Sequence, residues 1–391
     1  MKPSMEQAAD ARVIIFFVMA YQRIVAKFGT SLLTAGTGRL DLQVMSSLVA
    51  QVAALRKQGK DITIVTSGAV AAGRQKLGPD ALRTMANGDI PSKQVLASVG
   101  QGRLMNAYEQ LFDWHDITVA QALLTRSALV DRAGYLNARN TLLGLNSLGV
   151  VCIVNENDVV ASEELEGVAF GDNDNLSAMV SNLIDADLLV LLTNIGGLYT
   201  ADPHSDPSAK LLTRVESIDE NIEKLAGGTA DKQGTGGMVT KLQAAKLATA
   251  SGAAVVVADG YLPNSLVRIA SGESLGTLFV PRVDRMESRK RWLACGLNAR
   301  GSLTVDDGAA GALKKDKSLL PAGVLGVEGD FNRGDVVYVV DSRGNRIACG
   351  VSNYDSGDIA KLKGVKSDRI SGILGYEFGA EVVHCNNLAM L

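Results

Sequence analysis

Short apolar runs alternate with stretches of helical periodicity over most of this chain, and this alternation limits the folds open to it. Between the first two runs, Leu42, Met45, Val49 and Val52 recur at helical spacing. Continuous apolar strands interleaved with helices are typical of a parallel sheet covered on both faces. We therefore expect an α/β fold with a mostly parallel sheet sandwiched by helices. The runs expected to form strands are Ile24–Phe28, Ile62–Val65, Val150–Val154, Leu188–Leu192 and Ala254–Ala258.

Each of these strands but the last is followed by a polar or glycine-rich string, and two more such strings stand where helices are expected to begin. In parallel sheets, ligands bind at the carboxyl ends of the strands. Small residues there let backbone N–H groups approach an anion. The sequence therefore predicts one binding site built from several strings. They are Lys27–Ser31, Thr66–Gly73, Asn155–Asp158, Gly171–Asn175, Thr193–Tyr199 and Gly234–Lys241.

Two lysines in these strings indicate an anionic ligand. Lys27 ends an apolar run beside glycine, where an ammonium group is seldom placed without an anionic partner. Lys241 lies at an expected helix start, where the helix dipole disfavours a cation unless an anion such as phosphate compensates it. The other strings leave alternatives open. Gly171–Asn175 is also compatible with a cation-binding loop or a helix N-cap, and Thr66–Gly73 with a packing turn.

Composition excludes several classes of protein. The 391 residues carry a net charge of −3, without the cationic excess of proteins that live on nucleic acid phosphates. The four cysteines, at positions 152, 295, 349 and 385, are too dispersed for a zinc site or a disulfide framework, which favours a reducing cytoplasm. The apolar run Val13–Ala20 is too short to span a bilayer, so we expect residues 1–21 to be a dispensable extension instead of a secretion signal.

The common nucleotide and nucleophile motifs are absent or out of context. The Gly59-Lys60 pair is followed by Asp61, so there is no P-loop, and no complete G-x-G-x-x-G occurs. Gly272–Gly276 matches the G-x-S-x-G nucleophile motif but continues as extended sequence where a helix should open. The three histidines, His115, His204 and His384, are isolated, so no histidine-based metal or base site is expected.

Taken together, the strings KFGTS, VTSGAVAAG, VNENDVVA, GDNDNLSA, GLYTADP and GTGGMVTKLQAA resemble those of the glutamate 5-kinase family, which has the amino acid kinase fold. The resemblance runs from about Arg23 to the C-terminus. The segment Ala299–Glu377 resembles the small, mainly-β PUA domain that many bacterial members append. It implies a kinase domain over 22–281, a basic linker over 282–298, a PUA domain over 299–378 and a C-terminal tail over 379–391.

This resemblance implies ATP-dependent phosphorylation of the γ-carboxylate of L-glutamate, the first step of proline biosynthesis. A carboxylate is already a nucleophile at neutral pH, so the difficulty is to stabilise charge on the transferring phosphoryl group. By the family pattern, Lys27 and Lys241 do this, Asp174 orients both ammonium groups, and Gly29 donates to phosphate. Mg²⁺ is expected to bind mainly through the ATP phosphates, and no metal-ligating residue is assigned.

The family pattern also assigns the two substrates. Ser67, Asp158, Asn173 and Asp172 are expected to bind glutamate, with the Asp158 carboxylate on the α-ammonium and Asn173 donating to the α-carboxylate. Asn194 stands where members commonly carry Asp, and Val239 replaces a usual Ser, so we expect changes in nucleotide affinity more than in reaction type. The residues expected to bind ATP are Lys27, Gly29, Thr193, Asn194, Thr235, Gly236, Gly237, Met238, Val239, Thr240 and Lys241.

The resemblance further implies partners. Proline is expected as a feedback inhibitor, with loop Ala161–Gly171 as the place of its effect, a glutamyl phosphate reductase as the next enzyme, and a homo-oligomer, dimer or tetramer. Related kinases of aspartate, acetylglutamate, carbamate or UMP are the main alternative. Residues 299–391 hold 11 Lys and Arg against 12 Asp and Glu, a net charge of −1, so neither an RNA partner nor a membrane is expected.

Overall fold

The computed structural model describes residues 21–83, 90–161, 173–203, 205–226, 237–281, 299–315 and 317–391. These fall into two compact units, one formed by residues up to 129 with 138–281, the other by 130–137 with residues from 299 onward. Several expectations concern residues outside the described ranges: Asp172, Thr235, Gly236, the linker 282–298, and almost all of the N-terminal extension and of loop 161–171.

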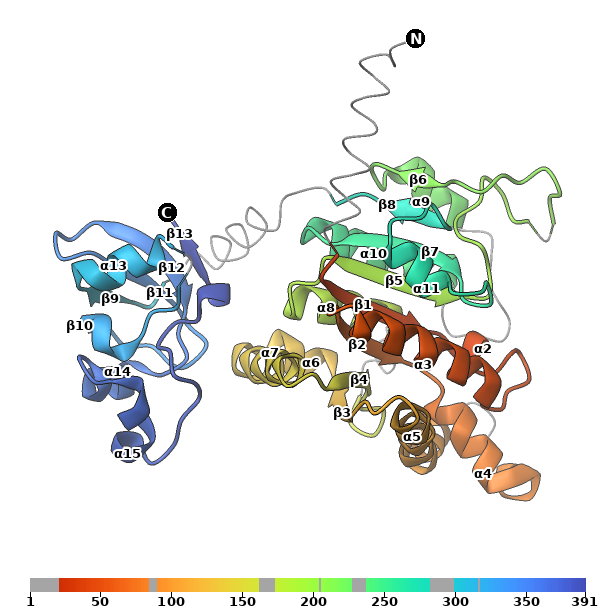
Figure 1. Cartoon of the computed structure of the whole chain (residues 1–391), viewed down its shortest axis with the longest axis horizontal. Coiled ribbons are helices and arrows are strands. Elements are labelled where there is room, and N and C mark those ends of the chain that lie inside the picture. Colours follow the sequence, from red (N-terminus) through yellow and green to blue (C-terminus); the bar gives the residue numbers. More distant parts are fainter. Residues whose placement is uncertain are drawn as a thin grey trace, which may run out of the picture. The chain divides into compact units, whose positions relative to one another are not determined.

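The first unit contains an eight-stranded sheet in the order β3-β4-β2-β1-β5-β7-β8-β6 (Figure 1). All neighbours are parallel except β7 and β8, so the expected mostly parallel α/β fold is confirmed. The strands are β1 Arg23–Phe28, β2 Asp61–Thr66, β3 Val119–Leu124, β4 Val151–Glu156, β5 Leu188–Thr193, β6 Arg214–Val215, β7 Ala254–Asp259 and β8 Thr277–Phe279.

Helices connect these strands, as the alternation of apolar runs and helical periods predicts. Helix α3 packs against β2, and its N-terminus is capped by the Asp41 carboxylate. The helices of this unit are α2 Thr30–Leu33, α3 Leu42–Lys57, α4 Ala69–Arg83, α5 Ile90–Asp113, α6 Arg126–Val130, α7 Arg132–Ser147, α8 Asn173–Leu183, α9 Glu220–Ala226, α10 Met238–Ala250 and α11 Ser265–Ala270. Of these, α6 and α7 straddle the boundary between the two units.

Alternation along the central strand separates the core from the site. Ile24, Ala26 and Phe28 point into one hydrophobic cluster, together with side chains of α3, α5 and α11. Because successive side chains of a strand point to opposite faces, Lys27 lies on the other face. That face carries α8, which packs against β1, and α10, which packs against α8.

The register of the parallel strands brings their carboxyl ends to one edge. Phe28 at the end of β1 pairs with Thr66 of β2 and with Leu192 of β5. In β4, Val154 pairs with Val65, so Asn155 is level with the end of β2, and Glu156 pairs with Leu124 at the end of β3. The polar strings that follow these strands are thereby collected at the same edge of the sheet.

The second unit is a five-stranded sheet in the order β10-β9-β11-β12-β13 with its own hydrophobic core. The expected tail over 379–391 is wrong: Leu388–Met390 form β13, which pairs with β12, and Val382 and Val383 are fully buried in the core. The elements are β9 Gly301–Val305, α13 Asp307–Leu313, β10 Val324–Gly329, β11 Val336–Val340, β12 Arg346–Val351, α14 Ser356–Leu362, α15 Ile370–Leu374 and β13 Leu388–Met390.

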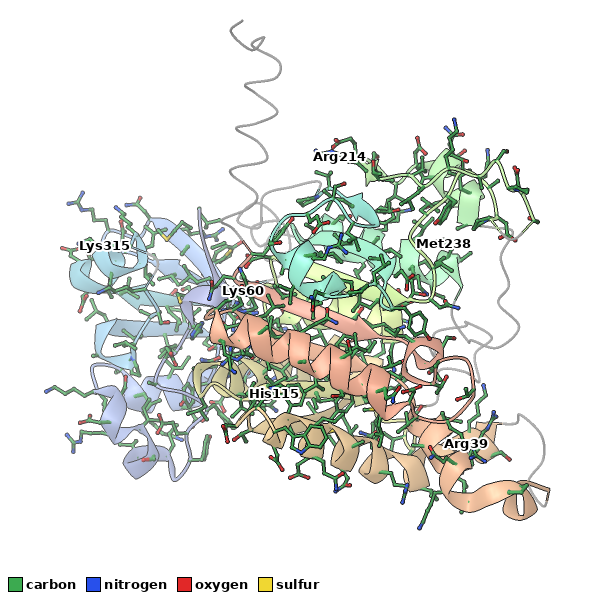
Figure 2. The ribbon with its side chains drawn as sticks, turned by 45° about the vertical axis from the view of Figure 1, so that its right-hand side comes forward. Arg39, Lys60, His115, Arg214, Met238 and Lys315 are labelled. Carbon is green, nitrogen blue, oxygen red and sulfur yellow. The ribbon has the colours of Figure 1, made fainter. Side chains whose placement is uncertain are left out.

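Charged side chains are displayed at the surface of both units. Arg39 and Arg214 of the first unit and Lys315 of the second are exposed and point outward (Figure 2). Within the described ranges, none of the helices combines the length and the apolar character needed to cross a membrane.

Candidate active site

Three buried charged side chains meet beneath the carboxyl edge of the sheet. Lys27 comes from β1, Asp174 from the first turn of α8, and Lys241 from the first turn of α10. Lys27 Nζ lies 2.5 Å from Asp174 Oδ1, and Lys241 Nζ lies 3.1 Å from Asp174 Oδ2. Lys27 is 5%, Lys241 8% and Asp174 0% exposed. The three residues expected to carry the chemistry are thus brought together.

This cluster sets two buried ammonium groups against one shared carboxylate. Burying charge is costly unless it is paired, and Asp174 pairs with both lysines at once. The ammonium groups lie where the first turns of α8 and α10 begin, so two helix dipoles add to their positive potential. The arrangement is therefore suited to bind a polyanion and to stabilise negative charge that develops during a transfer reaction.

Backbone and hydroxyl groups surround the cluster. A side chain at position 29 would place its Cβ 3.6 Å from Lys27 Nζ, so Gly29 leaves the space above this ammonium group open. Gly237 is the N-cap of α10. Thr240 Oγ1 donates to Asp174 Oδ2 at 3.0 Å, which gives this carboxylate oxygen a second partner beside Lys241. Both expected nucleotide strings therefore adjoin the cluster where the structure describes them.

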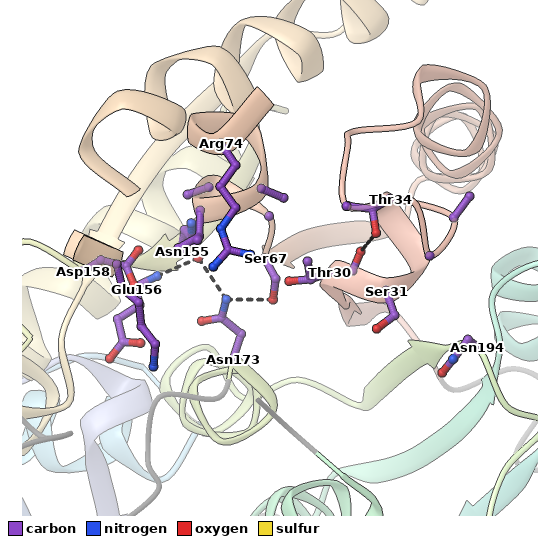
Figure 3. A pocket seen from close by; sticks show the side chains of 18 of the residues that line it. Thr30, Ser31, Thr34, Ser67, Arg74, Asn155, Glu156, Asp158, Asn173 and Asn194 are labelled. Atoms are coloured by element: carbon purple, nitrogen blue, oxygen red, sulfur yellow. Dashed lines mark hydrogen bonds between the residues drawn. The ribbon is translucent and has the colours of Figure 1, made fainter. Parts of the chain in front are cut away.

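A cavity of about 490 Å³ opens beside the cluster (Figure 3). Four residues expected to bind substrate or nucleotide line it: Ser67, Asp158, Asn173 and Asn194. Four ionisable groups of opposite sign, Arg74 and Lys93 against Glu156 and Asp158, also line it. The remaining lining residues are Thr30, Ser31, Thr34, Ala35, Gly36, Gly38, Gly68, Ala69, Val70, Ala71, Asn155 and Tyr261.

Asn173 joins the cavity to the buried cluster, because it directly precedes Asp174 at the start of α8. Its amide nitrogen donates to the Thr66 carbonyl at 2.7 Å, to Ser67 Oγ at 2.9 Å and to Asn155 Oδ1 at 3.0 Å. A carbonyl oxygen can only accept, so the contact with Thr66 fixes which end of the amide carries the nitrogen. In this structure the amide hydrogens of Asn173 are thus engaged within the protein, whereas the expected contact is with a carboxylate of the substrate.

Two tyrosines hold the loops that form the cavity. The hydroxyls of Tyr108 and Thr66 lie 2.8 Å apart at the end of β2, and burial raises the pKa of Tyr108 against the opposing effect of this hydrogen bond. Tyr261 donates from its hydroxyl to the Ser31 carbonyl at 3.1 Å. Burial raises the pKa of Tyr261, and the nearby carboxylates of Asp259 and Asp41 act in the same direction. Both phenols are thus kept neutral.

On the expected nucleotide side, Thr193 and Met238 are buried, whereas Asn194 and Val239 are exposed. Sequence reasoning assigned no role to the cavity residues Arg74, Lys93, Glu156 and Tyr261. A signal existed for two of them, because Arg74 directly follows the glycine-rich string Thr66–Gly73 and Glu156 lies inside a polar strand end. Lys93 and Tyr261 reach the cavity from α5 and from the turn after β7, where no motif marks them.

Comparison with known proteins gives the same division of the chain. Residues 22–259 match the amino acid kinase family, and residues 301–374 match the PUA domain. A protein named glutamate 5-kinase from Dehalococcoides mccartyi strain CBDB1 is 55% identical over 95% of this chain and 99% of its own. A protein of the same name from Herpetosiphon aurantiacus is 48% identical over 94% of this chain and 98% of its own.

Proposed function

This chain belongs to the amino acid kinase family and within it to the glutamate 5-kinases, and we propose that it phosphorylates the γ-carboxylate of L-glutamate with ATP by means of two buried lysines. The observation that carries this proposal is the Lys27–Asp174–Lys241 cluster, in which two buried ammonium groups share one carboxylate directly beside a cavity lined by acidic and amide side chains.

No protein group needs to form a covalent bond in this reaction. A γ-carboxylate oxygen attacks the γ-phosphorus of ATP, the bond from that phosphorus to the β,γ-bridging oxygen breaks, and ADP leaves with the electron pair. No general base is needed because the nucleophile is already ionised. Lys27 and Lys241 stabilise the charge that spreads over the transferring oxygens, and Asp174 holds both ammonium groups in place without taking a proton.

ATP fits the donor set of this site. The cluster offers two ammonium groups, and Gly29 and Gly237 stand where the backbone approaches it without side chains in the way. Mg²⁺ would bind with the nucleotide and supply charge neutralisation at its phosphates. Thr193, Asn194 and the described part of the string that ends at Lys241 form the rest of the nucleotide side.

Glutamate binding follows from the chemistry of the cavity walls. Asp158 supplies a carboxylate for the α-ammonium group, and Ser67 and Asn173 lie next to each other 2.9 Å apart at the start of α4 and α8. Because Asn173 and Asp174 are consecutive, the amino acid held at Asn173 has its γ-carboxylate beside the lysines.

The proposal also covers the next enzyme of the route, an inhibitor and the oligomeric state. The product, an acyl phosphate, hydrolyses readily, so a glutamyl phosphate reductase is the enzyme that should take it up at once in the cytoplasm. Proline, the end product of that route, resembles glutamate enough to inhibit at the same site. We further propose that the enzyme acts as a homo-oligomer, a dimer or a tetramer.

An assay of γ-glutamyl hydroxamate formation with ATP, Mg²⁺ and hydroxylamine tests the function directly. Glutamate should be the preferred acceptor over aspartate, acetylglutamate, carbamate and UMP when ADP release is followed in parallel, and proline should lower the rate with glutamate. A faster reaction with one of the other acceptors would overturn the choice of substrate.

A further inference from the structure

Arg74 is a cavity residue whose charge the assignments above leave unused. It lies on α4, one turn and a half beyond the start of that helix, and its side chain extends toward Ser67 and Asn173 (Figure 3). Helical side chains lean toward the N-terminus of their helix, so a long side chain at this position reaches back over the first turn. In the part of the chain that the structure describes, the Arg74 guanidinium has no ion pair or hydrogen bond.

At Asn173 and Asp158 the cavity offers atoms that accept hydrogen bonds. The amide nitrogen of Asn173 is committed to Thr66, Ser67 and Asn155, which leaves its Oδ1 as the remaining polar atom. This oxygen is buried and has no hydrogen-bond partner among the described residues. Asp158 adds a carboxylate to the cavity lining. A ligand group placed against these oxygens must be a donor, and an ammonium group satisfies both.

Around Arg74 the cavity donates hydrogen bonds instead. Ser67 Oγ accepts from Asn173, so its own hydroxyl hydrogen remains to be donated. Ser67 lies two residues before α4, which begins at Ala69, and the first turn of this helix carries no acidic side chain that would occupy its N–H groups. Backbone N–H groups at a helix start and a guanidinium group together are a strong receptor for a carboxylate.

We propose that Arg74 binds the α-carboxylate of the acceptor and thereby restricts this kinase to α-amino acids. The inference rests on the proposed function, because it takes glutamate as the acceptor. The two charged groups on the α-carbon are then bound by different residues: Asn173 Oδ1 and Asp158 accept from the α-ammonium group, while Arg74, Ser67 and the start of α4 donate to the α-carboxylate. The γ-carboxylate is left for the lysine cluster.

4-Aminobutyrate is the probe that isolates this contact, since it keeps the ammonium group and the reacting carboxylate of glutamate but lacks the α-carboxylate. The test measures kcat and KM by ADP release for glutamate, for 4-aminobutyrate and for ATP in the wild type and in Arg74→Gln. Lys76→Gln is the matched control, because it removes one exposed positive charge from the same helix outside the cavity lining.

For Arg74→Gln we expect the glutamate KM to rise about 10- to 100-fold, as for loss of a hydrogen-bonded charge pair. The ATP KM and the kcat/KM for 4-aminobutyrate should stay within about twofold of the wild type, so the preference for glutamate over 4-aminobutyrate collapses. Arg74→Lys should restore part of it, and Lys76→Gln should behave as the wild type.

Other results would overturn the assignment. An equal loss with glutamate and 4-aminobutyrate would show a structural role, and a rise in the ATP KM would place Arg74 at the triphosphate. If the wild type phosphorylates glutamate and Arg74→Gln has the same acceptor preference as the wild type, the role of Arg74 is rejected but the proposed function is not. A wild type that does not phosphorylate glutamate rejects the proposed function together with it.

Discussion

At the scale of single residues, the decisive feature is that Asp174 serves two lysines from different elements. One oxygen faces Lys27 and the other faces Lys241 and Thr240. Neither ammonium group can turn away without leaving buried charge uncompensated. The lysines are therefore held in position before any substrate arrives, which is the condition under which charged groups lower a barrier most effectively.

Replacing either lysine should remove this stabilisation. For Lys27→Ala and Lys241→Ala we expect kcat to fall by at least about 10²-fold at saturating glutamate and ATP, measured by ADP release. Lys246→Ala is the control, because Lys246 lies on the same helix as Lys241 but forms an exposed ion pair with Glu223. Circular dichroism checks that each variant is folded. Turnover near that of the control would refute the role of the lysine concerned.

The sequence was enough to predict several residues of this site, but it was not enough to predict all of their contacts. Lys27 and Lys241 stand out because a cation follows an apolar strand or begins a helix. The intramolecular hydrogen bonds of Asn173 could not be predicted, since they depend on Thr66 and Asn155, which lie 107 and 18 positions away. Arg74 was missed for the same reason: only the folded chain shows that its partners lie elsewhere.

At the scale of elements, α4 and α5 cross so closely that their backbones touch. A Cβ at Gly100 would lie 1.8 Å from the Ala69 carbonyl oxygen, and one at Gly73 would lie 2.0 Å from that of Leu96. The contact fixes the first turns of α4, which present Ser67 at their start and Arg74 just beyond them. These glycines thus set the position of one wall of the cavity from outside it.

A methyl group at this crossing should disturb stability and substrate binding together. We expect Gly100→Ala to lower the free energy of unfolding by about 3 kcal/mol or more, because the clash is with backbone that cannot rotate away. The glutamate KM should rise as α4 shifts. Gly102→Ala on the same helix has no neighbouring atom within 4 Å and should be neutral or stabilising by up to about 1 kcal/mol. Urea unfolding and steady-state kinetics compare the two, and similar stabilities would show that the helices can separate without cost.

Helices and strands were predicted correctly where the local sequence pattern is enough to define them. They were missed where a strand forms only because it pairs with a neighbouring strand. The five apolar runs all became strands, α3 formed over the expected residues, and α10 begins at Met238, three residues before Lys241. The edge strand β3 was not predicted, because its sequence VAQALL lacks both a continuous apolar run of β-branched residues and strict alternation. Strands β6 and β8, of two and three residues, are too short for any periodicity to show.

At the scale of the whole molecule, the chain consists of two units with separate hydrophobic cores. The boundary expected after residue 378 failed because pairing in the second unit is non-local. Gly379 accepts a hydrogen bond from the Tyr354 hydroxyl, and β13 pairs with β12 some 40 positions earlier. The second unit therefore needs the last residues of the chain to close its sheet.

Truncation after Phe378 should therefore unfold the second unit while leaving the first intact. The truncation removes the buried side chains of Val382, Val383 and Leu388 together with β13, a loss of several kcal/mol by comparison with single large-to-small substitutions. Calorimetry and limited proteolysis should show loss of one unfolding transition and rapid cleavage beyond residue 299. Deletion of the exposed Leu391 alone is the control. A truncated chain with both transitions would mean that the last strand is dispensable.

Because Asn173 and Asp174 are neighbours in α8, we expect their positions to limit the length of the acceptor. Asn173 lines the cavity and Asp174 holds the two lysines, and their Cα atoms are about 3.8 Å apart whatever side chains surround them. If glutamate binds as we propose, the backbone of α8 helps to set the distance between the held end of the substrate and its reacting carboxylate. A kinase for a shorter or longer acid made from this scaffold would require a displacement of that helix, and exchange of side chains in the cavity would not be enough.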